Sequence, residues 1–373
     1  MRNFELEVYL ARWEFRARYH MTASDIESMT IAELMALVPD GQMDKLENLR
    51  LGYTETHGSP VLREEIAHTY ERMQAEDILC FAGAEEGLYV AMKVLLDRND
   101  HAIVIVPNYQ ASETVPMDIC EVTGVALLPE EGWQLDIERV RKALKPNTKV
   151  ISINFPHNPT GVILERGRFD ELIRLCRERG IHLFSDEVYR LIERDESLRL
   201  PQVADVYERG ISLNVLSKAY GLPGLRIGWI ATKDHSLLQR MERYKHYLSI
   251  CNSAPSEYLA TVALQVKEKI LQRNRTLVNR NAVMLDAFFK EFPHLFEWKR
   301  PDGGCVAFPR YLGTEGANSF CEDLIEKTGV LLLPPNVYVS PLASTPEDRF
   351  RIGFGRRHME EGLAAFRGYL TRK

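Results

Sequence analysis

The stretch ISLNVLSKAYGLPGLRIGW (211–229) places Lys218 directly after a run of mostly apolar residues. Arg226 follows eight residues later, and three glycines lie in the segment between Lys218 and Trp229. A lysine is costly at the point where a strand leaves a core, unless its amine has a function there. The stretch therefore predicts two strands joined by a glycine-rich turn that presents an amine.

The pattern on either side of this stretch predicts an α/β fold with a mostly parallel, doubly wound sheet. The predicted strands are HAIVIV (101–106), KVISINF (149–155), IHLFSDEVY (181–189), ISLNVLSK (211–218) and RIGWIAT (226–232). Their nearly continuous apolar character is typical of a sheet covered on both faces. Helical spacing over 136–144 and 166–180 separates them, which gives the alternation of a βαβ fold.

The two ends of the chain predict a second, smaller α+β domain. After about residue 250, one or two long helices are followed by short strands and a final helix. Two capping boxes, Ser24-x-x-Glu27 and Thr30-x-x-Glu33, predict helix starts near the N-terminus. We expect a large domain at 45–265 and a small domain built from 1–44 and 266–373.

Composition excludes several classes of function. The 373 residues are 45% hydrophobic and 27% charged, which is ordinary for a globular protein, and the net charge of −6 argues against nucleic-acid or anionic-membrane binding. The first 20 residues lack a signal-peptide core, and no apolar run reaches the length of a membrane span. The six cysteines are scattered, which favours a cytoplasmic protein without disulfides or a metal site.

Residues capable of chemistry follow the ends of the predicted strands. In such sheets, ligands bind beyond the carboxyl ends of the strands. The residues expected at this edge are Gly83, Tyr109, Asn158, Asp186, Tyr189 and Lys218. The sequence therefore predicts that an amine, a carboxylate, an amide, two phenols and a glycine turn share one site.

This set suits pyridoxal 5′-phosphate (PLP). A lysine forms an imine (Schiff base) with an aldehyde, and PLP also carries a ring nitrogen, a phenolic oxygen and a phosphate. Asp186 can pair with the ring nitrogen, Asn158 and Tyr189 can bind the ring oxygen, and Tyr109 can stack on the ring. The N–H groups after Gly83, at a helix N-terminus, and the guanidinium of Arg226 can hold the phosphate.

In these motifs the chain resembles the fold-type I PLP enzymes, the class I and II aminotransferases, over nearly its whole length. Lys218 matches the Schiff-base lysine, Arg226 the phosphate arginine, Asp186 and Tyr189 the D-x-x-Y motif, and Asn158 the N-P-x-G motif. Gly83, Ala84 and Glu85 match the phosphate turn, and Tyr109 the ring-stacking aromatic residue. Arg351 in RFRIGFG is similar to the arginine that binds the substrate α-carboxylate. Asn158 is also expected to contact the substrate.

The resemblance also implies a homodimer with shared active sites. In YTETHGSPVLREEIA, Tyr53 matches a tyrosine that reaches the phosphate in the neighbouring subunit. The chain departs from the family pattern near the lysine and in the phosphate turn. Val215 stands three residues before the lysine where Ser or Thr is usual, with Ser217 closer to it, and the phosphate turn has Ala82, Ala84 and Glu85 where hydroxyl residues are common.

The reaction implied is transfer of an amino group from an α-amino acid to a 2-oxo acid, with Lys218, Asp186 and Tyr189 as catalytic residues. An alternative is a PLP-dependent lyase or cyclase, because YHMTASDIESMTIAEL (19–34) resembles capreomycidine synthases, which cyclise an arginine derivative. Asp25 and Glu27 would then meet a cationic side chain, unless they serve only in helix capping. A remote alternative is a non-catalytic PLP-binding sensor domain.

Overall fold

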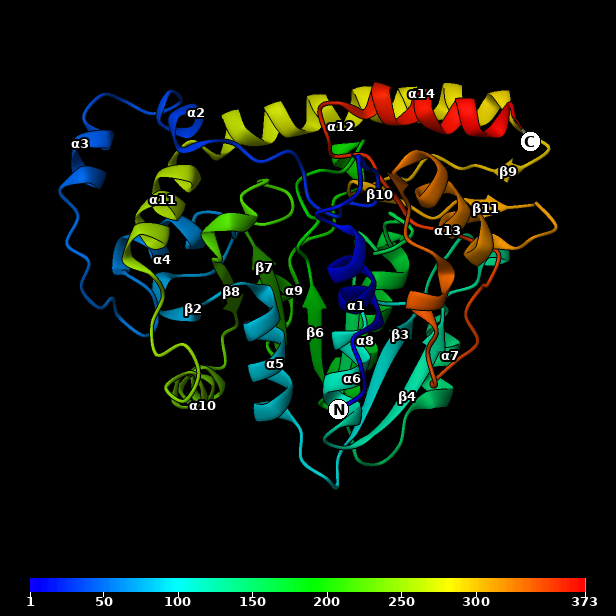
Figure 1. Cartoon of the computed structure of the whole chain (residues 1–373). Helices are drawn as coiled ribbons and strands as arrows, with labels where there is room; N and C mark the ends of the chain where they lie inside the picture. Colours follow the sequence, from blue (N-terminus) through cyan, green and yellow to red (C-terminus); the bar gives the residue numbers. More distant parts are fainter. Residues whose placement is uncertain (373) are drawn as a thin grey trace.

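A seven-stranded sheet forms the centre of the computed structural model, which describes residues 1–372 (Figure 1). Its strands run in the spatial order β2-β8-β7-β6-β5-β3-β4. They are β2 (Ile78–Phe81), β3 (His101–Val106), β4 (Glu121–Ala126), β5 (Thr148–Asn154), β6 (His182–Asp186), β7 (Gly210–Val215) and β8 (Gly228–Ala231). Strands β4, β3, β5, β6 and β7 are mutually parallel, and β8 is antiparallel to both β7 and β2. The predicted mostly parallel sheet is confirmed.

The five predicted strands all form, because their side chains are buried on both faces of the sheet. All residues of β3 and β6 are buried, for example. Strand β4 was not predicted, since its sequence EVTGVA is polar at the start and lies at the sheet edge with an exposed Glu121. An edge strand carries a weaker apolar signal than a central one.

Helices cover both faces of the sheet. On one face lie α5 (Ala84–Leu95), α6 (Ala111–Met117) and α10 (His235–Lys245), which form a buried apolar cluster with β2, β3 and β7. On the other lie α7 (Ile137–Ala143) and α8 (Arg166–Arg179). Gly180 ends α8 with φ +64°, as the sequence predicts for a helix that stops at a glycine. The remaining helices on the sheet side are α4 (Pro60–Ala67) and α9 (Val203–Val206), with short 3₁₀ turns at Ala75–Asp77, Pro129–Glu131, Glu196–Leu198 and Pro223–Leu225.

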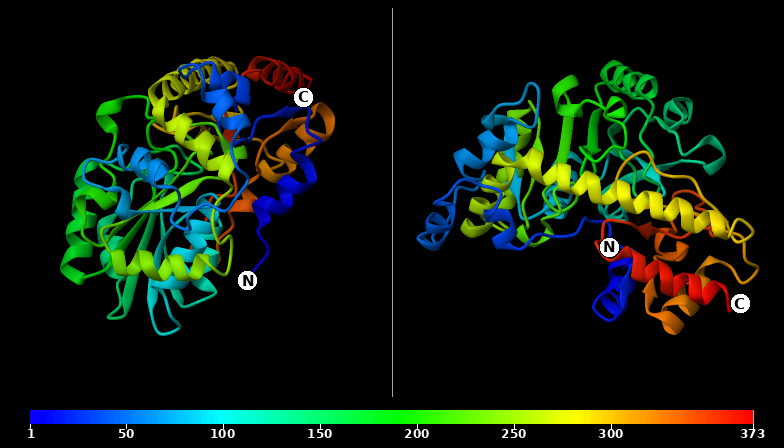
Figure 2. Two further views of the ribbon diagram at one scale, coloured as in Figure 1. Left: turned by 90° about the vertical axis from the view of Figure 1, so that its left-hand side faces the viewer. Right: turned by 90° about the horizontal axis from the view of Figure 1, so that it is seen from above.

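Two helices connect the sheet to the last third of the chain. They are α11 (Ala254–Gln265) and α12 (Lys267–Glu291), separated at Val266. Helix α12 runs across the top of the molecule with α14 (Met359–Leu370) beside it (Figures 1 and 2). The other elements of this part are β9 (Phe296–Glu297), β10 (Val306–Ala307), β11 (Arg310–Tyr311), α13 (Ala317–Thr328), β12 (Val330–Leu331), a 3₁₀ turn (Pro335–Tyr338) and β13 (Ile352–Gly353).

The N-terminal residues join this last third. Strand β1 (Tyr19–His20), which follows α1 (Glu5–Trp13), pairs in parallel with β12, so Tyr19 lies opposite Val330. Helices α2 (Ile31–Met35) and α3 (Gln42–Glu47) follow. The capping box of Thr30 and Glu33 is confirmed at the start of α2. The predicted helix start at Ser24 is wrong, because residues 24–27 are not helical.

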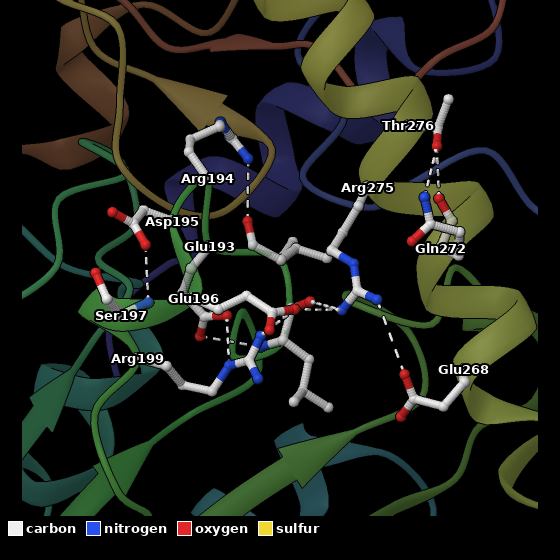
Figure 3. Close-up of polar contacts among 12 residues, drawn as sticks. Glu193, Arg194, Asp195, Glu196, Ser197, Arg199, Glu268, Gln272, Arg275 and Thr276 are labelled. Atoms are coloured by element: carbon white, nitrogen blue, oxygen red, sulfur yellow. Dashed lines mark hydrogen bonds and ion pairs between the residues drawn. The ribbon is translucent and has the colours of Figure 1, made fainter.

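One ion pair connects the loop after β6 to α12, and others lie within the helix and within the loop (Figure 3). Arg275 of α12 lies 3.6 Å from Glu196 of the loop and 3.8 Å from Glu268 of its own helix, and Arg199 lies 2.8 Å from Glu193 within the loop. Arg275 thus links the loop that follows Asp186 to the helix that crosses the molecule. Between residues 1 and 372, every helix is too short or too polar to cross a membrane.

Candidate active site

A cavity of about 340 Å³ lies beyond the carboxyl ends of β5, β6 and β7. Most of the predicted site residues line it: Ala84, Glu85, Tyr109, Asn158, Asp186, Tyr189, Ser217, Lys218, Arg226 and Arg351. They come from sequence positions 84 to 351, so the fold gathers them from both the sheet and the C-terminal third. The structure thus places in one cavity the groups that the sequence assigns to one site.

Lys218 stands in the turn after β7, three residues beyond its last residue, Val215. Its Nζ donates a hydrogen bond to Ser24 Oγ at 2.9 Å. Burial lowers the pKa of the amine; the Asp25 carboxylate acts against this effect and the Arg351 guanidinium adds to it. A lowered pKa increases the neutral share of the amine near neutral pH, and only the neutral amine can act as a base or nucleophile.

Asp186 is the last residue of β6 and is buried in the cavity wall. Its Oδ1 accepts the N–H of Val188 at 3.2 Å. Burial raises the pKa of Asp186 to about 6, although the Val188 hydrogen bond and the charge of Lys218 both lower it. A protonated ring nitrogen would supply the missing positive charge for this carboxylate.

The opposite end of the cavity is shaped for an anion. Gly83, with φ +95°, precedes α5, and a Cβ added there would lie 2.5 Å from Arg226 Nη2. The absence of a side chain therefore lets the guanidinium approach the first turn of α5, where helical N–H groups have no intrahelical acceptor. Gly228 likewise allows a close approach to the start of α5, because a Cβ added there would lie 2.6 Å from the backbone nitrogen of Ala84.

Ser217 lies in the same wall with an unused hydroxyl. Its Oγ is buried and makes no hydrogen bond within residues 1–372. Val215 also lines the cavity, at the position where the family usually has Ser or Thr. A phosphate oxygen next to Ser217 would give this orphaned donor a partner.

Glu85 and Tyr109 contact each other in the cavity wall. They share a side-chain hydrogen bond, and Tyr109 also packs against Phe4 with ring centroids 5.1 Å apart. Burial raises the pKa of Glu85 to about 7, while the Tyr109 hydrogen bond lowers it. Near neutral pH this carboxyl is therefore partly protonated, which lessens its repulsion of an anion.

A chain of amides connects Asp186 to Arg351. Asn154 Nδ2 donates to the carbonyl of Asp186 at 2.9 Å, and Asn154 Oδ1 accepts the N–H of Asn158 at 2.9 Å. Asn158 Oδ1 accepts from Arg351 Nη1 at 3.2 Å, and Arg351 Nη2 donates to the carbonyl of Thr22 at 2.9 Å. Arg351 is 2% exposed, and its Nε has no partner within residues 1–372. The guanidinium is thus held in place with donor capacity left for a carboxylate.

The sequence missed several cavity residues that come from distant segments. Ser24 was expected to cap a helix, whereas its hydroxyl binds Lys218 and its carbonyl accepts Tyr189 Oη at 3.0 Å. Arg356 lines the cavity and forms a two-bond ion pair with Asp25, at 2.9 and 3.3 Å. Local motifs carry no signal for such pairs, because the partners are 194 and 331 residues apart.

Three expected residues are not part of the cavity wall. Gly83 directly precedes the wall residue Ala84. Glu27, which was expected with Asp25 to meet a cationic group, accepts the backbone N–H of Arg357 at 3.1 Å and borders a neighbouring hollow, whereas Asp25 lines the cavity. Tyr53 is 92% exposed and is absent from the cavity wall of its own chain.

The residues present fit PLP. The gap left by Gly83 beside Arg226 and the orphaned hydroxyl of Ser217 suit its phosphate. The buried carboxylate of Asp186 suits its ring nitrogen, and Lys218 faces the same cavity as the amine for its aldehyde. The cavity volume of about 340 Å³ is in the range of small cofactor sites.

Comparison with known proteins agrees with this geometry. The family model described as aminotransferase class I and II matches residues 25–366. Capreomycidine synthase from Streptomyces vinaceus is 29% identical over 366 residues, which cover 96% of this chain and 92% of that protein. The arginine–pyruvate transaminase AruH from Pseudomonas aeruginosa is 30% identical over 297 residues, which cover 75% and 73% of the two chains.

Among solved structures, a PLP-dependent aminotransferase from Streptococcus suis 89-1591 is similar over the whole chain. It has a TM-score of 0.93 and 32% sequence identity, and the match covers 100% of this chain and 98% of that one. A match of this extent includes the sheet, the C-terminal third and the N-terminal segment that meet at the cavity.

Proposed function

Because this chain belongs to the class I and II aminotransferase family, we propose that it moves an amino group from an α-amino acid to a 2-oxo acid, with Lys218 as its catalytic amine. The observation that carries the proposal is that Lys218, Asp186 and Arg351 line one cavity. These three side chains supply a base, a buried anion and a carboxylate receptor.

The cofactor is PLP, which, when bound, supplies a carbonyl for the substrate amine and a ring that accepts electron density from the substrate Cα. Asp186 would hold the ring nitrogen, Tyr189 and Asn158 the ring oxygen, and Tyr109 the ring face. Arg226, Ser217 and the first-turn N–H groups of α5 (Ala84 and Glu85) would hold the phosphate.

Arg351 binds the α-carboxylate of the amino acid and thereby fixes the direction of its Cα–H bond. Lys218 Nζ then takes the proton from Cα as a general base and releases it as a general acid. Burial lowers the pKa of the amine, which favours the neutral form that this role requires. Substrate side chains would extend toward the wall formed by Asp25 and Arg356.

A PLP-dependent lyase or cyclase is the second candidate, and the similarity to capreomycidine synthase over 96% of the chain favours it. Both reactions begin with proton removal from Cα, so the same residues serve them. They differ in the need for a 2-oxo acid. The remote alternative, a non-catalytic sensor, predicts cofactor binding without turnover.

We also propose a cytoplasmic homodimer in which Tyr53 completes the site of the partner subunit. Tyr53, Leu51 and Tyr247 are 92%, 84% and 90% exposed, which is unusual for large apolar side chains unless a partner covers them. Arg226 is exposed as well, so the phosphate end of the cavity is open on the side that a partner would cover. We propose the domain division at 45–265 and at 1–44 with 266–373, because β1 pairs with β12 outside the main sheet.

The test is a screen of amino acids, including arginine, against the PLP-loaded protein. We expect the visible absorbance of the bound cofactor to change with an amino donor and to recover on addition of a 2-oxo acid. Lys218→Ala should abolish the lysine-linked absorbance, whereas the exposed Lys327→Ala should retain it. Product formed without any oxo acid would favour the lyase or cyclase, and cofactor binding without turnover would favour the sensor.

A further inference from the structure

The segment Met21–Glu27 forms an arch that lines the cavity with residues 22–25 and is anchored at both ends to the stretch RIGFG (351–355), which contains Arg351. The N–H of Gly353 donates to the carbonyl of Met21 at 2.9 Å, and the N–H of Glu27 donates to the carbonyl of Gly355 at 2.8 Å. A Cβ on Gly353 would overlap the carbonyl of Ala23. The two glycines of the sequence RIGFG (351–355) therefore allow this arch to lie directly on the strand.

Ser24 lies in the middle of the arch with both of its polar groups directed to site residues. Its carbonyl accepts Tyr189 Oη at 3.0 Å, and its hydroxyl accepts Lys218 Nζ at 2.9 Å. Residues 24–27 are not helical, so the hydroxyl does not cap a helix. The hydrogen bond with Lys218 is therefore the interaction of this side chain that the structure shows.

We propose that Ser24 is a positioning residue, whose hydroxyl holds Lys218 Nζ in the position from which the amine exchanges a proton with the substrate Cα. The inference rests on the proposed function, since it concerns the same amine. It adds a residue that no motif of the sequence indicates.

The physical need for such a partner follows from the lysine side chain. Lysine ends in a compact amine on a flexible four-carbon stem, and its free amine samples many rotamers unless a hydrogen bond selects one. Proton transfer demands hydrogen-bond distance and direction between amine and Cα. Ser24 can hold the amine in one rotamer because its own backbone is fixed. Its carbonyl binds Tyr189, and the segment around it is hydrogen-bonded at both ends to Gly353 and Gly355.

The charges around Lys218 change the pKa of its amine, but they do not fix the direction in which Nζ points. The groups that act on it are Asp25, Arg351, Cys305 and Asp186. Asp25 is engaged with Arg356, and Arg351 with Asn158 and Thr22. Within residues 1–372, the hydrogen bond of Lys218 Nζ is the one that it donates to Ser24 Oγ.

The test compares Ser24→Ala with Ser24→Thr, which keeps the hydroxyl, and with Ser28→Ala, an identical change at the exposed residue that directly follows the segment. For the half-reaction with an amino donor, we expect kcat of Ser24→Ala to fall about 10-fold with KM nearly unchanged, because positioning of the base is lost after substrate binds. Ser24→Thr should regain most of the rate, and Ser28→Ala should match the wild type.

A second measurement uses the protein without cofactor. The pKa of the Lys218 amine is obtained from the pH dependence of its acetylation rate, followed by mass spectrometry of the peptide that contains it. The Ser24 hydroxyl favours the charged amine as an acceptor, so its removal should lower this pKa by about 0.5 to 1. Ser24→Thr and Ser28→Ala should leave it unchanged.

An unchanged kcat in Ser24→Ala would overturn the inference, and so would a lower kcat with an unchanged amine pKa, which would show a packing role instead. If the wild-type protein fails to bind PLP through Lys218, the proposed function fails. The acetylation measurement would still show in that case whether Ser24 binds the amine.

Discussion

Arg351 Nη1 donates a hydrogen bond to Asn158 Oδ1 at 3.2 Å, so the proposed carboxylate receptor is joined to the loop that follows β5. Tyr338 Oη approaches the same oxygen at 3.5 Å. The amide oxygen of Asn158 is thus occupied by side chains of the C-terminal third, and its NH₂ group remains to donate toward a ligand. The proposed carboxylate receptor is thereby held at the contact between two parts of the chain that are far apart in the sequence.

Replacement of Arg351 tests this relationship. Arg351→Lys removes the planar fork that binds a carboxylate through two hydrogen bonds, and we expect KM for amino donors to rise by a factor on the order of 10 to 100. Arg357→Lys is the control, because that guanidinium lies on the surface and pairs with Glu33 at 3.0 Å. Steady-state kinetics give KM for each variant, and equal KM values for Arg351→Lys and Arg357→Lys would contradict the role of Arg351.

Gly83→Ala tests the phosphate end of the cavity. The added Cβ would come within 2.5 Å of Arg226 Nη2, and φ is +95° at this position, so the guanidinium and the turn must both shift. We expect the Kd for PLP to rise by about 10-fold or more, since a charged hydrogen bond is worth about 1.5 to 3 kcal/mol. The control is Gly224→Ala, for which residues 1–372 place no atom within 4 Å of the new Cβ. Fluorescence titration with PLP measures both, and equal affinities would refute the assignment of this turn.

The buried carboxyl of Asp186 makes the stability of the cofactor-free protein depend on pH. Its pKa rises from 3.8 to about 6 on folding, which corresponds to at most about 3 kcal/mol. A raised pKa means that the carboxyl favours the folded state fully below pH 3.8, and that this contribution is lost as the pH rises through about 6.

We therefore expect the free energy of unfolding of the wild type, relative to Asp186→Asn, to fall between pH 5 and pH 8. Urea unfolding of both proteins at the two pH values measures the difference, and other titrating groups cancel in the comparison. The effect should disappear when PLP is bound, because a protonated ring nitrogen stabilises the ionised carboxylate. A pH-independent difference would show that Asp186 is already ionised in the folded protein.

Hybrid dimers test whether Tyr53 serves the partner subunit. A dimer of one Tyr53→Ala chain and one Lys218→Ala chain would contain one site with both residues intact. Co-expression of the two inactive variants should therefore restore about a quarter of the wild-type activity, if chains pair at random in a two-fold dimer. Activity no higher than that of either variant alone would show that Tyr53 acts within its own chain or has no role in the site.

The sequence predicts the central sheet well because the signal there is local. Strand β3 has its predicted limits, 101–106, since its apolar run is bounded by Asp100 and Pro107. The predicted final helix also forms, as α14. The cavity residues at strand ends follow from the parallel topology, which brings Asp186 and Lys218 to the same edge.

The sequence fails where a contact depends on distant segments. Ser-x-x-Glu at 24–27 and Thr-x-x-Glu at 30–33 have the same capping pattern, yet only the second caps a helix among the residues described. The first pattern does not start a helix, because the backbone around Ser24 is hydrogen-bonded to Gly353 and Gly355, more than 300 positions later. The ion pair of Asp25 with Arg356 joins equally distant segments, so the sequence could name Asp25 as a candidate but not its partner.

The pairing of β1 with β12 also has a consequence for biosynthesis. Residues 19–27 are translated more than 300 positions before the partners that anchor them, Val330, Gly353 and Gly355. The nascent sheet of residues 78–231 can collapse in the meantime around its own apolar clusters. A ribosome-stalled chain ending before residue 330 would thus contain Lys218 and Ser24 without the anchors that hold the serine, and the proposed catalytic centre would be complete only after residue 355 has been made.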